Sequence, residues 1–225
     1  MSTRHVAQLE IEEERAFYDN HYARSNVTAP IPLHFLPEAD WQLWNQYVGP
    51  LTGKRVLECG AGDGKLAVWL AKQGASVLAV ELSPVGVEKI KERAHYHGLS
   101  SQVKAYCGDC SRLEDIFDCE SVDVALGWSV LHHLPPKEFG QSLAAVLKPE
   151  AHALFLENSS ANPFYRFARL IKNNESASGS PLTIQEVNTL IKAVGSGKIV
   201  YPRFVLFGLM KKYVFRNNQR IASCL

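Results

Sequence analysis

The chain has neither an excess of charge of one sign nor a long apolar run. Its 225 residues include 24 Lys and Arg against 23 Asp and Glu, which leaves a formal net charge of +1. Binding to the nucleic-acid backbone needs a basic face, so we expect no nucleic-acid partner. No stretch approaches the roughly 20 apolar residues of a membrane span, so none is expected. The early run Glu12-Glu13-Glu14 is unlike a signal peptide, and we expect a cytoplasmic protein.

Cysteine is also scarce, with five residues in the chain. Cys107 and Cys110 form a C-x-x-C pair, but neither a second pair nor a His at ligand spacing accompanies them. An odd number of cysteines argues against a disulfide framework. We therefore predict no metal site and interpret the cysteines as reduced thiols that fill tight turns.

No internal repeat or low-complexity linker divides the chain, and its length suits one α/β domain with a full core. Strand-like and helix-like segments alternate, which favours a Rossmann-like, mostly parallel sheet with helices on both faces, plus an N-terminal helical cap. We expect the cap at residues 1–49 and the main domain at 50–225, with a substrate-side insertion at about 158–182. The expected strands are 55–57, 76–80, 103–106, 122–126 and 151–156, and the expected helices are 4–23, 39–48, 65–71, 84–97 and 136–147.

The C-terminal third is less regular. A helix is expected at 161–172, and Thr183 with Glu186 three residues later predicts a capping box for a helix that runs to about Val194. Residues 198–212 are apolar and contain Pro202, which favours one or two strands. An interfacial membrane helix is the alternative for this segment.

A glycine-rich turn follows the first expected strand. Glu58 ends that strand, and Gly60, Gly62 and Gly64 lead into a helix. Glycine has no Cβ, so a ligand can approach the main chain closely. The spacing differs from the G-x-G-x-x-G that receives a pyrophosphate, and the acid at Asp63 favours a cationic ligand over a phosphate.

A carboxylate also ends the second expected strand. Glu81 stands where an acidic side chain accepts the two hydroxyls of a ribose. Together with the glycine turn, it predicts a domain that binds a cationic, phosphate-free nucleoside.

These motifs resemble class I S-adenosylmethionine-dependent methyltransferases of the small-molecule type. The resemblance covers about residues 50–160, where the glycine motif, Glu81, Gly108-Asp109-Cys110 and the segment 122–134 occur in the order of the family. It implies S-adenosylmethionine as cofactor and S-adenosylhomocysteine as product. It further implies that the second-strand acid holds the ribose and that the acid at 109 faces the adenine amino group. The implied cofactor-binding residues are Glu58, Gly60, Gly62, Gly64, Glu81, Leu82, Asp109, Cys110, Gly127 and Trp128.

Histidines and tyrosines are the candidate catalytic residues. His132 and His133 follow the fourth strand, and a histidine there is able to take a proton from the acceptor. We expect His132, rather than His133, to face the transferring methyl group, with a structural or cofactor-contacting role as the alternative for each. Tyr18 and Tyr22 precede the domain, and some family members pair such a tyrosine with the loop histidine as a lid latch. Ordinary helix packing is the alternative for both tyrosines.

The acceptor itself is less defined by the sequence. His21, Glu157, Asn158 and Tyr165 are the candidate substrate-binding residues, because strand C-termini and the cap border the expected site. A salt bridge from Glu157 to Arg166 or Arg169 is the alternative for that acid. We expect a small-molecule acceptor, either a metabolite or a natural product, and a monomer or homodimer. The alternatives are a nucleic-acid or protein methyltransferase and a noncatalytic partner subunit with the same fold.

Overall fold

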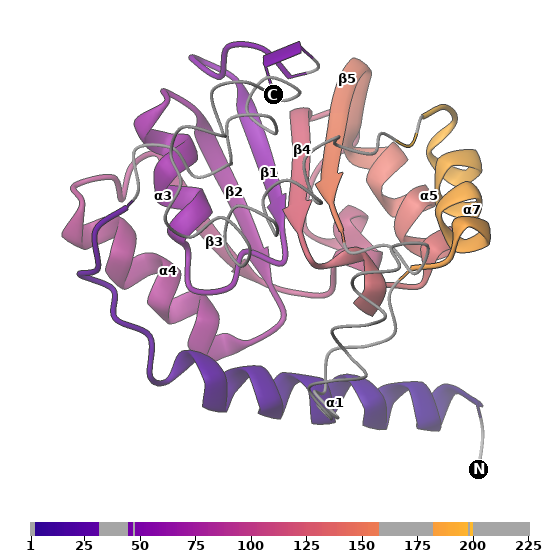
Figure 1. Cartoon of the computed structure of the whole chain (residues 1–225), viewed down its shortest axis with the longest axis horizontal. Coiled ribbons are helices and arrows are strands. Elements are labelled where there is room, and N and C mark those ends of the chain that lie inside the picture. Colours follow the sequence, from indigo (N-terminus) through magenta and orange to yellow (C-terminus); the bar gives the residue numbers. More distant parts are fainter. Residues whose placement is uncertain (1–2, 32–44, 47, 158–181, 198, 200–225) are drawn as a thin grey trace, which may run out of the picture.

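The computed structural model describes residues 3–31, 45–46, 48–157, 182–197 and 199 (Figure 1). Five parallel strands form one sheet in the order β3-β2-β1-β4-β5. This confirms the expected α/β fold with a parallel sheet. The strands are β1 (Arg55–Cys59), β2 (Ser76–Glu81), β3 (Val103–Cys107), β4 (Val122–Trp128) and β5 (Leu147–Leu156).

Helices cover both faces of the sheet. The helices are α1 (Thr3–Tyr22), α3 (Lys65–Lys72), α4 (Pro84–Tyr96), α5 (Pro136–Val146) and α7 (Ile184–Val194), with short 3-10 turns η1 (Cys110–Asp115) and η2 (Leu131–His133). None of the helices in the described part of the chain is long and apolar enough to cross a membrane. The helices expected at 39–48 and 161–172 lie wholly or largely outside the described residues, as does the segment 198–212.

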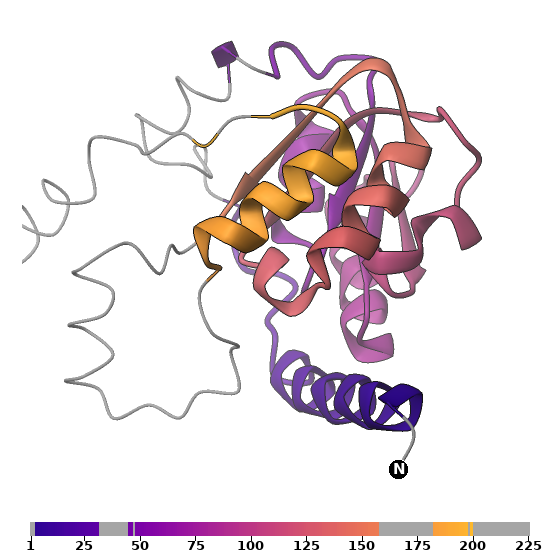
Figure 2. The ribbon, with the colours of Figure 1, turned by 90° about the vertical axis from the view of Figure 1, so that its right-hand side faces the viewer.

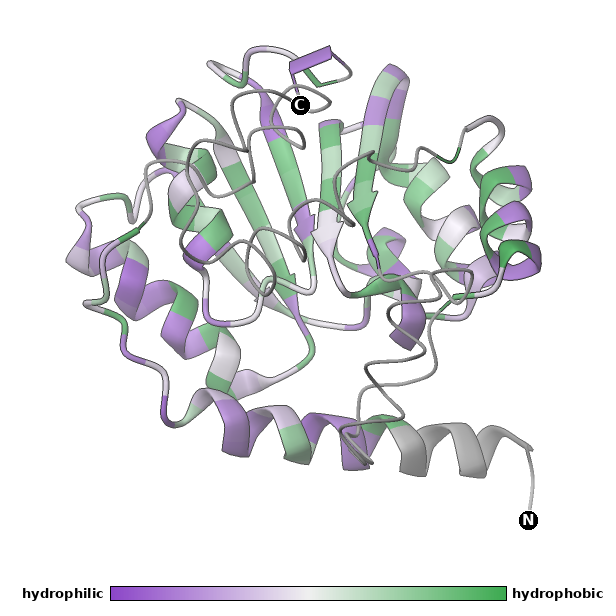
Figure 3. Cartoon of the chain, in the orientation of Figure 1, coloured by the Kyte–Doolittle hydropathy of each residue, from purple (hydrophilic) through white to green (hydrophobic). Residues whose placement is uncertain are grey.

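The strand side chains point alternately to the two faces of the sheet, which divides the core into two layers. Val56 packs with α3 and α4 on one face, whereas Leu57 packs with η1, α5 and α7 on the other. Successive strand side chains point to opposite faces, so a strand that is apolar at every position is buried on both sides. Figure 3 shows this as continuous hydrophobic colour along the central strands.

The fifth strand begins earlier than the sequence predicted. The expected start at Ala151 is wrong, because the pairing with β4 already begins at Leu147 and then shifts register. Val122 pairs with Leu147 and Val124 with His152, so the intervening residues loop out of the ladder. Glu150 in this irregular stretch has a φ of 65°, which a non-glycine residue adopts rarely.

The cap helix crosses the edge of the sheet that carries the functional residues. In Figure 1 the strand arrows point toward α1, which lies across their carboxyl ends, and Figure 2 shows it outside the two helical layers. Loops at the carboxyl ends of parallel strands are the usual ligand site of such sheets. The helix therefore covers the edge where the sequence motifs end.

Helix α7 packs against α5 on the second face (Figure 2). The capping box predicted at its start is present: the Thr183 hydroxyl accepts from the Glu186 N–H at 3.2 Å, and the Glu186 carboxylate accepts from the Thr183 N–H at 2.8 Å. At the contact between the helices, a Cβ on Gly140 would lie 2.6 Å from the Cβ of Ala193. The missing side chain therefore allows the two helices to approach closely.

We expect Thr183→Ala to lower the free energy of unfolding by about 1 kcal/mol, because the first turn of α7 loses its capping acceptor. Urea unfolding followed by circular dichroism measures this change. Thr189→Ala in the same helix is the matched control, since its exposed hydroxyl donates to the Gln185 carbonyl within the helix and does not cap it. An equal loss in the two variants would contradict a specific role for the cap.

Candidate functional site

Two buried carboxylates lie side by side at the carboxyl ends of β1 and β2. Glu58 is 3% exposed and Glu81 is 5% exposed, although glutamate is almost never buried unless it is paired. Parallel pairing of β1 with β2 sets Glu58 opposite Ala79, two residues before Glu81. The strand pattern thus places both acids at the same edge of the sheet.

Glu81 fastens the glycine turn to the end of β2. Its Oε2 accepts from the Gly62 N–H at 2.8 Å, and its Oε1 accepts from the Ser83 N–H at 2.9 Å. Burial raises the pKa of Glu81 above its ordinary value, while these amide donors act in the opposite direction. Each carboxylate oxygen has a second lone pair, so Glu81 retains the capacity to accept from a ligand.

Glu58 lacks such compensation. Its Oε2 is buried, and none of the described residues donates a hydrogen bond to it. Burial raises the pKa of Glu58 well above its ordinary value, and the nearby negative charges of Glu81 and Asp63 raise it further. A buried acid without a partner costs free energy, and a cationic ligand would remove that cost. The arrangement fits the positively charged nucleoside that the sequence predicted.

Asp63 does not take part in this ligand site in the way that the sequence suggested. Its carboxylate lies 2.9 Å from Arg93 Nη2 and 3.0 Å from Lys65 Nζ. Burial alone would raise the pKa of Asp63, but Lys65 and Arg93 together hold it below its ordinary value. The acid is neutralised within the protein, so the interpretation that it favours a cationic ligand is wrong for this residue.

Arg93 connects three segments of the chain. It is fully buried in α4 and donates to the Asp63 carbonyl at 2.8 Å. It also donates to the carbonyls of Asn26 at 3.0 Å and Val27 at 3.2 Å, just after α1. Helix α4 and the segment after α1 therefore have fixed positions relative to the glycine turn.

The cap helix α1 contacts loops from two different strands. Tyr18 Oη lies 3.1 Å from His133 Nε2, and Glu14 Oε1 lies 2.7 Å from His133 Nδ1. One turn further on, the Asp19 carboxylate accepts from the Ser83 hydroxyl. The cap is thus held to the loop after β4 and to the start of α4.

Tyr22 lies directly on the glycine turn. A Cβ on Gly62 would approach the Tyr22 hydroxyl to 3.2 Å, and one on Gly86 would approach the Tyr22 ring to 2.9 Å. Burial and the charge of Glu81 raise the pKa of Tyr22 far above its ordinary value. Burial, with Glu14 and Glu81, likewise raises the pKa of Tyr18 to about 12, so both phenols keep their protons.

The two histidines after β4 have different partners. His132 Nδ1 lies 2.9 Å from Glu157 Oε2, whereas both ring nitrogens of His133 contact α1. Their ring centroids are 4.1 Å apart. Among the described residues, none has a hydrogen bond to His132 Nε2. His132 is therefore held by the residue that follows β5, whereas His133 is held by the cap helix α1.

Glu157 organises the loop that carries these histidines. Its Oε1 accepts from the Val130 N–H at 2.5 Å and from the Leu131 N–H at 2.6 Å. The sequence suggested either an acceptor contact or a salt bridge to Arg166 or Arg169 for this acid. The observed bonds are different, and the two arginines lie outside the described residues. Adjacency in sequence gave no signal for this contact, which links residues 25 to 27 positions apart.

Asp109 begins the short turn η1 after β3, and its Oδ1 accepts from the Ser111 N–H at 2.8 Å. Cys110 beside it is buried against Cys59, and a hydrogen bond between these thiols, with burial, raises the pKa of Cys59 well above its ordinary value. Both are free thiols. A raised pKa makes a thiol a poor nucleophile, so this pair fills space between the two loops.

Other candidate residues lie around this edge with less definite roles. Gly127 is the last but one residue of β4, where a Cβ would collide with Val130 and Phe155, and Trp128 beside it is 39% exposed. Leu82 follows Glu81, and His21 is on the exposed side of α1 with its ring stacked on Phe17. Asn158 and Tyr165 lie outside the described residues.

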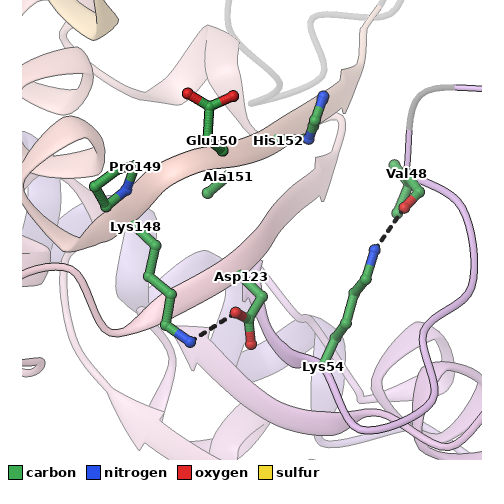
Figure 4. A pocket seen from close by; sticks show the side chains of 8 residues that line it. All are labelled: Val48, Lys54, Asp123, Lys148, Pro149, Glu150, Ala151 and His152. Carbon is green, nitrogen blue, oxygen red and sulfur yellow. Dashed lines mark hydrogen bonds and ion pairs between the residues drawn. The ribbon is translucent and has the colours of Figure 1, made fainter.

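A hollow of about 330 Å³ lies at the opposite end of the sheet (Figure 4). Lys54, Asp123 and Lys148 line it, and each already has a partner: Lys54 Nζ donates to the Val48 carbonyl, and Lys148 pairs with Asp123. These residues surround the amino ends of β1, β4 and β5. The hollow is therefore remote from the carboxylates and histidines described above.

The family match and the curated relatives of this chain are both methyltransferases. A family described as a methyltransferase domain matches residues 56–150. The ubiquinone biosynthesis O-methyltransferase of Actinobacillus pleuropneumoniae is 29% identical over 126 residues, which cover 55% of this chain and 54% of that protein. The chain thus spans about half the length of the curated relatives that it matches.

Solved structures share the fold at low identity. The cyclase SpnF aligns with a TM-score of 0.60 and 18% identity, covering 80% of this chain and 70% of that one. A geranyl diphosphate C-methyltransferase from Streptomyces coelicolor, in complex with S-adenosylhomocysteine, aligns with a TM-score of 0.59 and 13% identity, covering 81% and 78%. These likenesses show the fold alone.

We expect Arg93→Met to lower the free energy of unfolding by about 3–5 kcal/mol, because it leaves the buried Asp63 without its guanidinium partner. Lys91→Met is the matched control, since the same helix there has an exposed ion pair with Glu88. That variant should change stability by less than about 1 kcal/mol. Urea unfolding compares the two, and equal losses would contradict a central role for Arg93.

Proposed function

We propose that this chain, which belongs to the class I S-adenosylmethionine-dependent methyltransferases, transfers a methyl group to a hydroxyl oxygen of a small-molecule acceptor. The relative from Actinobacillus pleuropneumoniae carries the name of an O-methyltransferase of ubiquinone biosynthesis, which favours oxygen as the methylated atom. The observation that carries the proposal is the buried Glu58 beside Glu81, since none of the described residues donates a hydrogen bond to Glu58 Oε2, and a sulfonium nucleoside would provide a counter-charge.

S-adenosylmethionine is the cofactor of this family and supplies an activated methyl group. In this chain Glu81 would hold the ribose hydroxyls, Asp109 would face the adenine, and the backbone of the glycine turn would border the sugar. Gly62 and the end of β2 are already joined by a hydrogen bond of 2.8 Å, so this part of the site is organised before the cofactor binds.

His132 is the proposed base. With Glu157 ionised, its carboxylate accepts from His132 Nδ1–H, and this tautomer leaves a lone pair on Nε2. The acceptor hydroxyl would give its proton to Nε2 as its oxygen attacks the methyl carbon and the sulfur–carbon bond breaks, with S-adenosylhomocysteine as the leaving group. Glu157 would stabilise the imidazolium that forms. Bonds from Glu157 to the Val130 and Leu131 amides fix the position of the loop during this step.

His133 has a different proposed role. Its contacts with Tyr18 and Glu14 join the loop to α1, so it acts as the anchor of the cap rather than as a second base. Tyr22 covers the glycine turn from the same helix. A docked cap excludes water from the reacting groups and aligns them, and alignment supplies much of the rate of an in-line displacement.

Two other functions remain as alternatives from the sequence. A nucleic-acid or protein methyltransferase would act on a macromolecule, and a noncatalytic partner would keep the fold without transfer. The likeness to a cyclase illustrates that this fold alone does not fix the reaction. Transfer of an isotope-labelled methyl group to extracted metabolites, compared with transfer to nucleic acid and protein, distinguishes these functions. The cytoplasmic location and the monomeric or homodimeric state stay predictions.

We expect Glu81→Ala to weaken cofactor binding by about 1–3 kcal/mol, because the ribose hydroxyls lose a charged acceptor. Glu81→Gln should retain part of the affinity. Calorimetry on folded protein measures both, with Glu88→Gln on the exposed side of α4 as the control. Unchanged affinity in the two Glu81 variants would refute the ribose assignment.

We expect His132→Ala to lower turnover about a hundredfold or more with little change in cofactor affinity, because the acceptor loses its base. Glu157→Gln should lower turnover as well, since the neutral amide stabilises the imidazolium less. Wild-type turnover should fall in acid, where a protonated imidazole no longer accepts a proton.

His95→Ala is the control for this series, because His95 is exposed on α4. Steady-state rates with a labelled methyl donor, measured from acid to alkaline pH, provide the comparison. Near-normal turnover of His132→Ala at every pH would show that the acceptor arrives already nucleophilic.

A further inference from the structure

Ser129 has a backbone conformation that is rare for its residue type. Its φ is 53°, in the left-handed region that favours glycine. Two other non-glycine residues in the described part of the chain have a positive φ: Glu120 precedes β4, and Glu150 lies in the looped-out start of β5. Ser129 instead directly follows the carboxyl end of β4, three residues before His132. Such a conformation costs free energy and persists where the surrounding structure holds it, so its place beside the site points to a functional role.

Contacts before and after this residue hold the conformation. The Ser129 N–H donates to the Leu156 carbonyl at 2.9 Å, so the hydrogen bonding between β4 and β5 continues to this point. The next side chain, Val130, is buried against two glycines: a Cβ on Gly127 would lie 2.7 Å from it, and a Cβ on Gly60 in the glycine turn would lie 2.5 Å from it. The chain therefore leaves the strand at Ser129, and Val130 occupies the space that the two glycines leave open.

The change of direction turns two backbone amides toward one carboxylate. Val130 has a φ of −119° and a ψ of −32°, so a left-handed residue is followed by a right-handed one. Successive residues of opposite hand turn their N–H groups to one side and form a concavity that binds an anion. Here the Val130 and Leu131 N–H groups donate to Glu157 Oε1 at 2.5 and 2.6 Å. The other oxygen of Glu157 contacts His132 Nδ1 at 2.9 Å.

We propose that Ser129 is a positioning residue: its left-handed backbone holds Glu157 in place and thereby selects the His132 tautomer that carries its proton on Nδ1. A carboxylate only accepts hydrogen bonds, so its contact with Nδ1 places the hydrogen on that nitrogen and the lone pair on Nε2. The role belongs to the backbone of Ser129 and not to its hydroxyl group. The inference rests on the proposed function, because this tautomer matters for catalysis where Nε2 takes the proton of the acceptor.

Two substitutions separate the backbone of Ser129 from its hydroxyl group. Ser129→Gly loses the hydroxyl group but adopts a positive φ freely, whereas Ser129→Thr keeps the hydroxyl group and adds a β-branch that disfavours this region. Nitrogen NMR of the isotope-labelled full chain, at a pH where the imidazole rings are neutral, reports which nitrogen of His132 carries the proton. The spectrum of His132→Gln assigns the signal.

We expect the Nδ1–H tautomer of His132 in the wild-type protein and in Ser129→Gly, and a shift toward the Nε2–H tautomer in Ser129→Thr. Turnover should follow the tautomer and fall about tenfold or more in Ser129→Thr, because the lone pair of the base then lies on the wrong nitrogen. Glu120 provides the matched control, since its φ of 50° is similar and it is exposed before β4. Glu120→Gly and Glu120→Thr change the backbone strain in the same way and should leave both the tautomer and turnover unchanged.

A wild-type tautomer in folded Ser129→Thr would overturn the inference. Loss of the Nδ1–H tautomer in Ser129→Gly would overturn it as well, since the role would then belong to the hydroxyl group. If Ser129→Thr does not fold, Ser129→Asn takes its place, because asparagine tolerates a positive φ without a hydroxyl group and should keep the wild-type tautomer. Loss of that tautomer in Ser129→Asn would contradict a backbone role.

The NMR measurement needs neither cofactor nor acceptor, so it separates this inference from the proposed function. A tautomer that changes as expected in Ser129→Thr while turnover stays constant would support the positioning of the ring and refute His132 as the base. A wild-type tautomer in Ser129→Thr together with a large loss of turnover in His132→Ala would have the opposite meaning: the base would stand, and the role of Ser129 would fail.

Discussion

The position of the site depends on the fully buried guanidinium group of Arg93. It neutralises Asp63 in the glycine turn and donates to carbonyl groups of the segment that follows α1. Without it, the charged turn and the polar segment after α1 would meet the last turn of α4 with their polar groups unsatisfied. A buried ion pair contributes little net stability over an apolar contact of similar volume. The main consequence of Arg93 is therefore geometric, because it fixes the segment that follows α1 relative to the glycine turn.

Because Asp63 is neutralised by Arg93 and Lys65, the acids near the glycine turn that lack a cationic partner among the described residues are Glu58 and Glu81. Glu58 and Glu81 are buried at adjoining strand ends, and the described cations Arg93 and Lys65 are engaged with Asp63. The two acids therefore raise each other's cost of ionisation until a cation arrives. In the proposed function, selectivity for a positively charged nucleoside comes from the unpartnered Glu58 beside Glu81, whereas the glycine spacing alone would only exclude a pyrophosphate.

Features with a local cause were predictable from the sequence. The glycine turn, the capping box of Thr183 and the order of the motifs along the chain are such features. Each motif depends on residues within a few positions of one another, and the structure has them where the sequence patterns indicated. Contacts between segments that are far apart in the sequence were not predictable. Arg93 meets Asp63 across 30 positions and Glu157 meets His132 across 25, and no periodicity indicates either pair. The looped-out start of β5 was missed because Lys148, Pro149 and Glu150 are polar or break strands, which concealed the earlier pairing at Leu147.

The adjacent residues His132 and His133 show how the fold gives two identical side chains different partners. A one-residue step along the short turn η2 directs one ring to β5 and the next to α1. The ring that faces Glu157 is held by a rigid strand end, which suits a group that must present a lone pair in a fixed direction. The ring that faces Tyr18 and Glu14 is held by a helix that crosses the sheet edge. In the proposed function, proton transfer and anchoring of the cap therefore fall to neighbouring residues, and the element that each ring contacts distinguishes the two roles.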